Sequence, residues 1–229
     1  MSRNFSLSRL LLRVVKEWFT ALKSREIGHM LVFWNERLVL LSVPKTGTTA
    51  LEQTLGPVAS MAILDPPQLK HAPIYRYNRF FRPMFEKVGG DGMEVAAVMR
   101  EPIDWLGSWY RYRSRPFMKG KPASTEGIGF DDFIKGYMKG DKPPYADVGS
   151  QATFLAPRAN GTGVDHLFRY EDQAGFLAFL EHRLGREITL PRANVSPRME
   201  LSLSPGVERR LRDKCAEEFA LWESIPVRG

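Results

Sequence analysis

The sequence has a single cysteine and no pattern typical of a metal site. Cys215 is the only cysteine among 229 residues. An intrachain disulfide is therefore impossible, and we expect a reducing, cytoplasmic environment. No group of His, Cys, Asp and Glu has metal-ligand spacing, and there is no internal repeat or low-complexity tract. The sequence thus excludes a disulfide-stapled scaffold and predicts no metal centre.

The chain has the size of one globular domain and an excess of positive charge. Its length and its hydrophobic content of 43% suit one α/β domain with a sizeable core. Lys and Arg number 33 against 26 Asp and Glu, which gives a net charge of +7. We therefore expect acidic ligands, such as a nucleotide donor, an anionic acceptor or a membrane surface. The charge alone does not favour nucleic acid, and we predict no nucleic-acid partner.

Residues 1–28 are predicted to form a basic amphipathic helix, part of or appended to a domain of residues 29–229. Leu7, Leu11, Trp18 and other apolar residues fall on one helical face. The apolar run 10–12 is broken by Arg13, too early to span a bilayer or form a secretory core. The apolar face favours packing on the domain or on a second copy in a homodimer. The alternative is peripheral membrane contact through residues 7–23.

The stretch 38–49, LVLLSVPKTGTT, predicts a buried strand that leads into the N-terminus of a helix. Free N–H groups and the positive end of the helix dipole meet at such a junction, where a phosphate or sulfate binds. Gly47 lets the backbone approach the anion, and Lys45 adds a mobile charge. The anion-binding residues we expect are Lys45, Thr46, Gly47, Thr48 and Thr49. The loop lacks the G-x-x-x-x-G-K-[ST] order of the usual nucleoside-triphosphate loop.

A second stretch, residues 94–112, repeats the strand-to-helix pattern. An apolar strand of residues 95–99 ends at Arg100, and Pro102 suits the first turn of a new helix. Ser108 lies on that helix. An arginine at a strand end can grip a phosphate with two parallel N–H bonds, and a serine hydroxyl can complete the clamp. We therefore expect Arg100 and Ser108 to bind a second anion.

These two motifs resemble those of the sulfotransferases that use 3′-phosphoadenosine 5′-phosphosulfate (PAPS). PKTGTT resembles the 5′-phosphosulfate loop, and R-E-P-x5-S-x-Y resembles the 3′-phosphate signature. The resemblance implies an α/β fold, a P-loop-like parallel sheet with helices on both faces, with PAPS as donor and 3′-phosphoadenosine 5′-phosphate as product. Ala50 stands where many small-molecule sulfotransferases have tryptophan, which favours the carbohydrate-type branch. The resemblance also suggests a late basic residue, Arg198 or Arg192, at the 3′-phosphate or adenine.

Sulfuryl transfer to an alcohol needs a base and stabilisation of the leaving group. His71, between the two motifs, suits the general base because its ordinary pKa lies near neutrality. Glu52 and Glu86 are the alternatives, and so is a purely structural role for His71. Lys45 is predicted to stabilise the charge that grows on the departing phosphate oxygen.

The basic stretches 75–82 and 110–121 contain interleaved aromatic residues. They suit an acidic or saccharide acceptor, such as a glycan or glycolipid, although single-stranded nucleic acid or a solvated helix face would give the same pattern. Two other classes of protein also fit the whole sequence. One is an ATP-dependent nucleotide or sugar kinase, and the other is a non-catalytic module that binds anionic glycans or membranes.

Overall fold

The computed structural model describes residues 30–158, 161–191 and 199–228. The predicted N-terminal helix, Arg192 and Arg198 lie outside the described residues. Within them, no helix combines the length and apolarity needed to cross a membrane.

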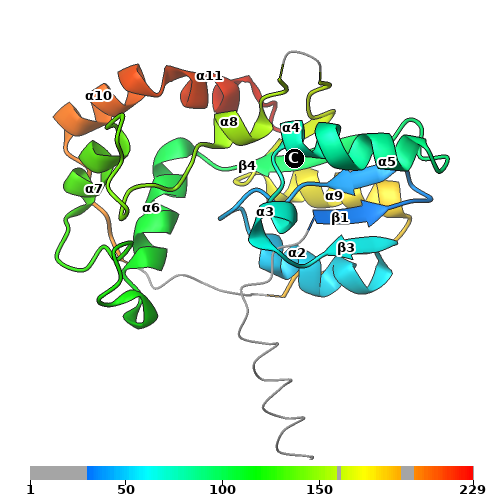
Figure 1. Cartoon of the computed structure of the whole chain (residues 1–229), viewed down its shortest axis with the longest axis horizontal. Helices are drawn as coiled ribbons and strands as arrows, with labels where there is room; N and C mark the ends of the chain where they lie inside the picture. Colours follow the sequence, from blue (N-terminus) through cyan, green and yellow to red (C-terminus); the bar gives the residue numbers. More distant parts are fainter. Residues whose placement is uncertain (1–29, 159–160, 192–198, 229) are drawn as a thin grey trace, which may run out of the picture.

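The protein is an α/β fold built on a five-stranded mixed sheet in the order β3-β1-β2-β4-β5 (Figure 1). The parallel part contains β2, β4 and β5, while β1 runs antiparallel to both β2 and β3. The strands are β1 (Met30–Phe33), β2 (Leu38–Leu40), β3 (Met61–Ile63), β4 (Glu94–Met99) and β5 (His166–Arg169). The prediction of a parallel sheet was therefore wrong for its β1–β3 edge. The turn of residues 34–37 is too short for anything but an antiparallel hairpin.

Helices cover both faces of the sheet, as predicted, because its strands carry apolar side chains on both sides. One face packs Val32, Val39 and Val95 against Tyr77 and Phe85. The opposite face packs its own strand residues against α2 (Thr48–Leu55) and α9 (Gln173–Leu184). The first face is covered by α4 (Ile74–Arg76), η2 (Tyr77–Phe81), α5 (Arg82–Glu86) and α8 (Gln151–Leu155). Figure 1 shows α4 and α5 on one side of the sheet and α2 on the other.

A third apolar cluster lies beyond the end of β4. It packs Trp105 and Leu106 against Phe133 and Leu211. Its helices are α6 (Pro102–Arg113), α7 (Phe130–Tyr137), α10 (Pro205–Lys214) and α11 (Ala216–Ser224). The remaining short helices are η1 (Gly56–Val58), α3 (Pro67–Lys70) and η3 (Pro116–Met118). This layer places α6 next to the carboxyl ends of the parallel strands, the edge where open α/β sheets bind ligands.

Candidate functional site

The predicted anion loop lies between β2 and α2, and two of its residues have left-handed backbone dihedrals. Lys45 has φ +69° and Gly47 φ +76°, both in the left-handed region. The Thr46 hydroxyl is buried and donates to the Val43 carbonyl at 2.8 Å, which closes the loop on itself. Thr46 is therefore placed to contribute its backbone N–H, since its side chain is used internally.

The first turn of α2 contains Thr48 and Thr49, and no side chain caps it. Gly47 occupies the N-cap position in the left-handed conformation, so the N-cap residue offers the first N–H groups of the helix no side-chain acceptor. A β-carbon on Gly47 would lie 3.2 Å from Tyr170 Cε2. The sequence folds this way locally because glycine both tolerates the dihedral and leaves room for the tyrosine ring.

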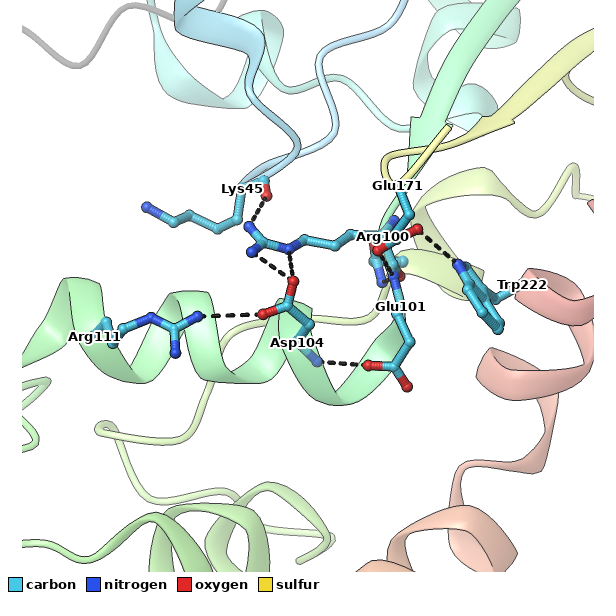
Figure 2. Close-up of polar contacts among 8 residues, drawn as sticks. Lys45, Arg100, Glu101, Asp104, Arg111, Glu171 and Trp222 are labelled. Atoms are coloured by element: carbon cyan, nitrogen blue, oxygen red, sulfur yellow. Dashed lines mark hydrogen bonds and ion pairs between the residues drawn. The ribbon is translucent and has the colours of Figure 1, made fainter. Parts of the chain in front are cut away.

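Arg100 follows β4 directly, as predicted, and its side chain reaches back to the loop. Its Nη1 donates to the Lys45 carbonyl at 3.2 Å, while Nε donates to Asp104 Oδ2 at 2.7 Å. The guanidinium also lies over the Tyr170 ring, with Cζ 4.5 Å from the centroid. Figure 2 shows Arg100 lying between the loop above it and α6 below it. The ends of β2, β4 and β5 thus meet around one guanidinium.

Helix α6 begins as the sequence predicts. The Glu101 carboxylate accepts from the Asp104 N–H at 2.7 Å, and Pro102 fills the first turn. Burial raises the pKa of Glu101, against the lowering effect of its backbone hydrogen bonds. Ser108 is buried on the same helix, 4% exposed. A second tie to the loop comes from Trp105, whose indole N–H donates to the Pro44 carbonyl at 2.8 Å.

The Lys45 side chain points away from Arg100 (Figure 2). Its ammonium lies 4.2 Å from the centroid of the Tyr112 ring and 5.5 Å from that of Trp109. Both rings belong to the C-terminal half of α6. The lysine is thus held by a cation–π contact at the outer end of the loop.

His71 lies next to the start of the same loop. Its Nδ1 is 2.8 Å from the Ser42 carbonyl. Because a carbonyl oxygen can only accept, the hydrogen is on Nδ1, and Nε2 of the neutral ring carries the lone pair that a base needs. The histidine follows α3, and the residue that its ring contacts, Ser42, comes three positions before Lys45 in the chain. The structure therefore brings His71 and Lys45 to the same loop.

Glu52 and Glu86, the alternatives to His71 as general base, differ in their surroundings. Glu52, on α2, has its pKa raised to about 7 by burial, and Lys70 partly counteracts this rise. Glu86 is exposed at the end of α5, on the helical layer of the first face. Among the described residues, no group of three or more His, Cys, Asp or Glu could hold a metal ion.

Sequence reasoning missed three residues that build the site. Gln151 is 1% exposed, and its amide pairs with the Arg100 backbone: Arg100 N donates to Oε1 at 3.0 Å and Nε2 donates to the Arg100 carbonyl at 2.9 Å. Asp104 and Tyr170 hold the Arg100 side chain. The i,i+4 spacing of Arg100 and Asp104 could have indicated that pair. The stretch 150–155 resembles a sulfotransferase segment that lines the cofactor side, but the resemblance assigns Gln151 no contact of its own.

Two comparisons with known proteins found nothing similar to this chain. A scan against models of protein families found no match, and a search of curated proteins found none at the significance threshold.

Proposed function

We propose that this protein is a sulfotransferase that moves a sulfuryl group from PAPS to a hydroxyl or amine, on a carbohydrate or glycolipid. The observation that carries the proposal is the meeting of the Lys45 loop with Arg100 at neighbouring parallel strands, where Arg100 Nη1 lies 3.2 Å from the Lys45 carbonyl. The P-loop-like character of the fold belongs to the same proposal. A nucleotide with phosphates at both ends of its ribose matches two adjacent anion sites.

The loop and the arginine would hold different ends of the donor. The N–H groups at residues 46–49 and the Lys45 ammonium would hold the 5′-phosphosulfate, because the start of α2 has no side-chain cap. Arg100 and Ser108 would hold the 3′-phosphate. Arg100 is pre-organised by Asp104 and Tyr170, which lowers the entropic cost of binding.

Transfer would proceed by in-line attack of the acceptor oxygen on sulfur. The new O–S bond forms as the bond between sulfur and the 5′-phosphate oxygen breaks, and the acceptor proton passes to Nε2 of His71. The Lys45 ammonium would stabilise the charge left on the phosphate oxygen. A phosphosulfate offers that ammonium a stronger partner than the Tyr112 ring does.

The surface next to Lys45 supports an acidic or saccharide acceptor. The Tyr112 ring lies 5.5 Å from Phe117, centroid to centroid, and Phe117 is 50% exposed. Arg115 Cζ lies 5.5 Å from the centroid of the Tyr112 ring, and Lys121 Nζ lies 5.6 Å from that of Phe117, both within the range of a cation–π contact. Aromatic faces suit the apolar side of a sugar ring, and the cations suit a carboxylate or sulfate on it.

The test is a calorimetric titration of the whole chain with 3′-phosphoadenosine 5′-phosphate and, separately, with ATP and Mg²⁺. We expect binding of the first and not of the second. Arg100→Ala should weaken binding roughly 10–100-fold, because it removes charge-assisted hydrogen bonds to a phosphate. Arg209→Ala, at an exposed position of α10, is the matched control and should bind normally.

Activity is tested by transfer of radiolabelled sulfate from PAPS to a panel of glycans and lipids. A preference for ATP would instead support a kinase. Binding of anionic glycans with neither nucleotide bound nor sulfate transferred would support a non-catalytic module. Either result would refute the sulfotransferase proposal.

A further inference from the structure

Asp104 lies between Arg100, which precedes α6, and Arg111, which is on it. Its Oδ2 contacts Arg100 Nη2 at 2.6 Å, and its Oδ1 contacts Arg111 Nη2 at 3.3 Å. Figure 2 shows both guanidinium groups directed at this carboxylate. Asp104 and Arg111 are seven residues apart on α6, close to two full turns, so they share one face of the helix. The two guanidiniums therefore converge on one point beside the loop.

The two arginines are largely removed from water, while the carboxylate between them is not. The side chains of Arg100 and Arg111 are 14% and 15% exposed, and that of Asp104 is 45% exposed. Two guanidiniums share one carboxylate, so the cluster keeps a net positive charge. A buried charge without full compensation is costly, and an arriving anion would supply the missing partner.

Arg111 is the less satisfied of the pair. Among the described residues its guanidinium contacts one acceptor, at the long distance of 3.3 Å, although a guanidinium has five N–H donors. The Arg111 guanidinium packs next to Gly107: a β-carbon on Gly107 would lie 3.5 Å from Nη1 and 3.6 Å from Nη2. The guanidinium thus lies back along α6, over the turn that contains Ser108.

We propose that Arg111 is a second arginine of the 3′-phosphate site and that Asp104 is the positioning residue that holds it beside Arg100. The inference rests on the proposed function and deepens it. A phosphate monoester carries close to two negative charges at neutral pH. Arg100 alone is neutralised by Asp104, whereas Arg100 and Arg111 together leave one positive charge beside Asp104 and match the phosphate better. Ser108 and Arg111 are neighbours on the helix surface at i,i+3, so one phosphate can reach both.

The test compares two nucleotides that differ only in the 3′-phosphate. The affinities of 3′-phosphoadenosine 5′-phosphate and adenosine 5′-phosphate are measured by competition for the full chain and for Arg111→Ala. We expect Arg111→Ala to weaken the doubly phosphorylated nucleotide about tenfold and to leave the other within twofold. Arg111→Lys, which keeps the charge but loses the planar fork, should give an intermediate loss. Arg209→Ala serves again as the control for a lost arginine.

A structural role for Arg111 would weaken both nucleotides equally, and such a result, or no loss at all, would overturn the inference. Thermal unfolding shows whether Arg111→Ala folds. If it does not, the two nucleotide affinities of Arg111→Lys test the role of Arg111 instead. Arg100→Ala separates this failure from that of the proposed function. If Arg100→Ala loses the preference for the 3′-phosphorylated nucleotide and Arg111→Ala keeps it, only the role of Arg111 is refuted. If neither variant loses that preference, the donor site itself is refuted.

Discussion

Replacing Glu52 by Gln should make the stability of the protein less dependent on pH. Glu52 lies on α2, the helix that starts at the anion loop. Burial raises its pKa from 4.5 to about 7, although Lys70 acts in the opposite direction. In the unfolded chain the carboxyl ionises near its ordinary value. Between these two pH values the folded protein holds a proton that the unfolded chain has released.

The sign follows from proton binding. Because the folded state binds more protons between pH 4.5 and about 7, the free energy of unfolding falls as the pH rises through that range. The rise in pKa sets an upper bound of about 3 kcal/mol for this loss. The side chain is only partly buried, so solvent screens the effect, and we expect about 1–2 kcal/mol. Glutamine carries no ionisable group and removes the dependence.

The measurement is urea denaturation of the wild type and Glu52→Gln at pH 5 and pH 8. The free energy of unfolding of Glu52→Gln, relative to that of the wild type, should be about 1–2 kcal/mol higher at pH 8 than at pH 5. Other titrating groups act equally on both proteins and cancel in this comparison. Glu187→Gln, at an exposed position, controls for the loss of a carboxylate. An unchanged difference between wild type and Glu52→Gln at the two pH values would refute the reasoning.

Three further predictions address the loop and the chemistry. Gly47→Ala should cost about 1–2 kcal/mol in denaturation, and more than Gly89→Ala, because both have positive φ but only Gly47 faces Tyr170 within 4 Å. Equal losses would mean that the Tyr170 contact is unimportant. His71→Ala should lower turnover roughly 10²–10⁴-fold and leave binding of the product nucleotide unchanged; near-normal turnover would remove His71 from the mechanism. Turnover should persist in excess chelator, since Lys45 stabilises the leaving group, and a strict Mg²⁺ requirement in the same assay would contradict this mechanism.

Local chemistry made part of the fold predictable. Residues 30–34, 38–43, 95–99 and 164–170 are short apolar runs bounded by turn residues, a pattern that predicts the strands β1, β2, β4 and β5. Glu171 and Asp172 predict the start of a helix and Gly185 its end, and α9 confirms both: Asp172 accepts from the Gly175 N–H at 3.0 Å, and Gly185 is left-handed. Such signals depend only on neighbouring residues, so one sequence is enough to find them.

The β3 strand shows where that approach fails. The prolines at 57, 66 and 67 predict an irregular connection that contains one short apolar piece, residues 60–64, yet Met61–Ile63 pairs with β1. Pairing depends on a partner about thirty residues earlier in the chain, and a strand of three residues has too short a pattern to indicate it. Two apolar runs joined by residues 35–37 do predict a hairpin, and the antiparallel pairing of β1 with β2 confirms it, so only the pairing and direction of β3 were missed.

For the candidate site, the sequence by itself determined which residues end the strands: the loop with Lys45 and Gly47 after β2, and Arg100 after β4. Parallel neighbours bring such ends to one edge, so their meeting was foreseeable. Only the tertiary structure decided how they are held. Gln151 reaches the Arg100 backbone from 51 residues away, and His71 reaches Ser42 from 29 residues away. These contacts arise when separate segments pack together, and no local preference of either segment encodes them.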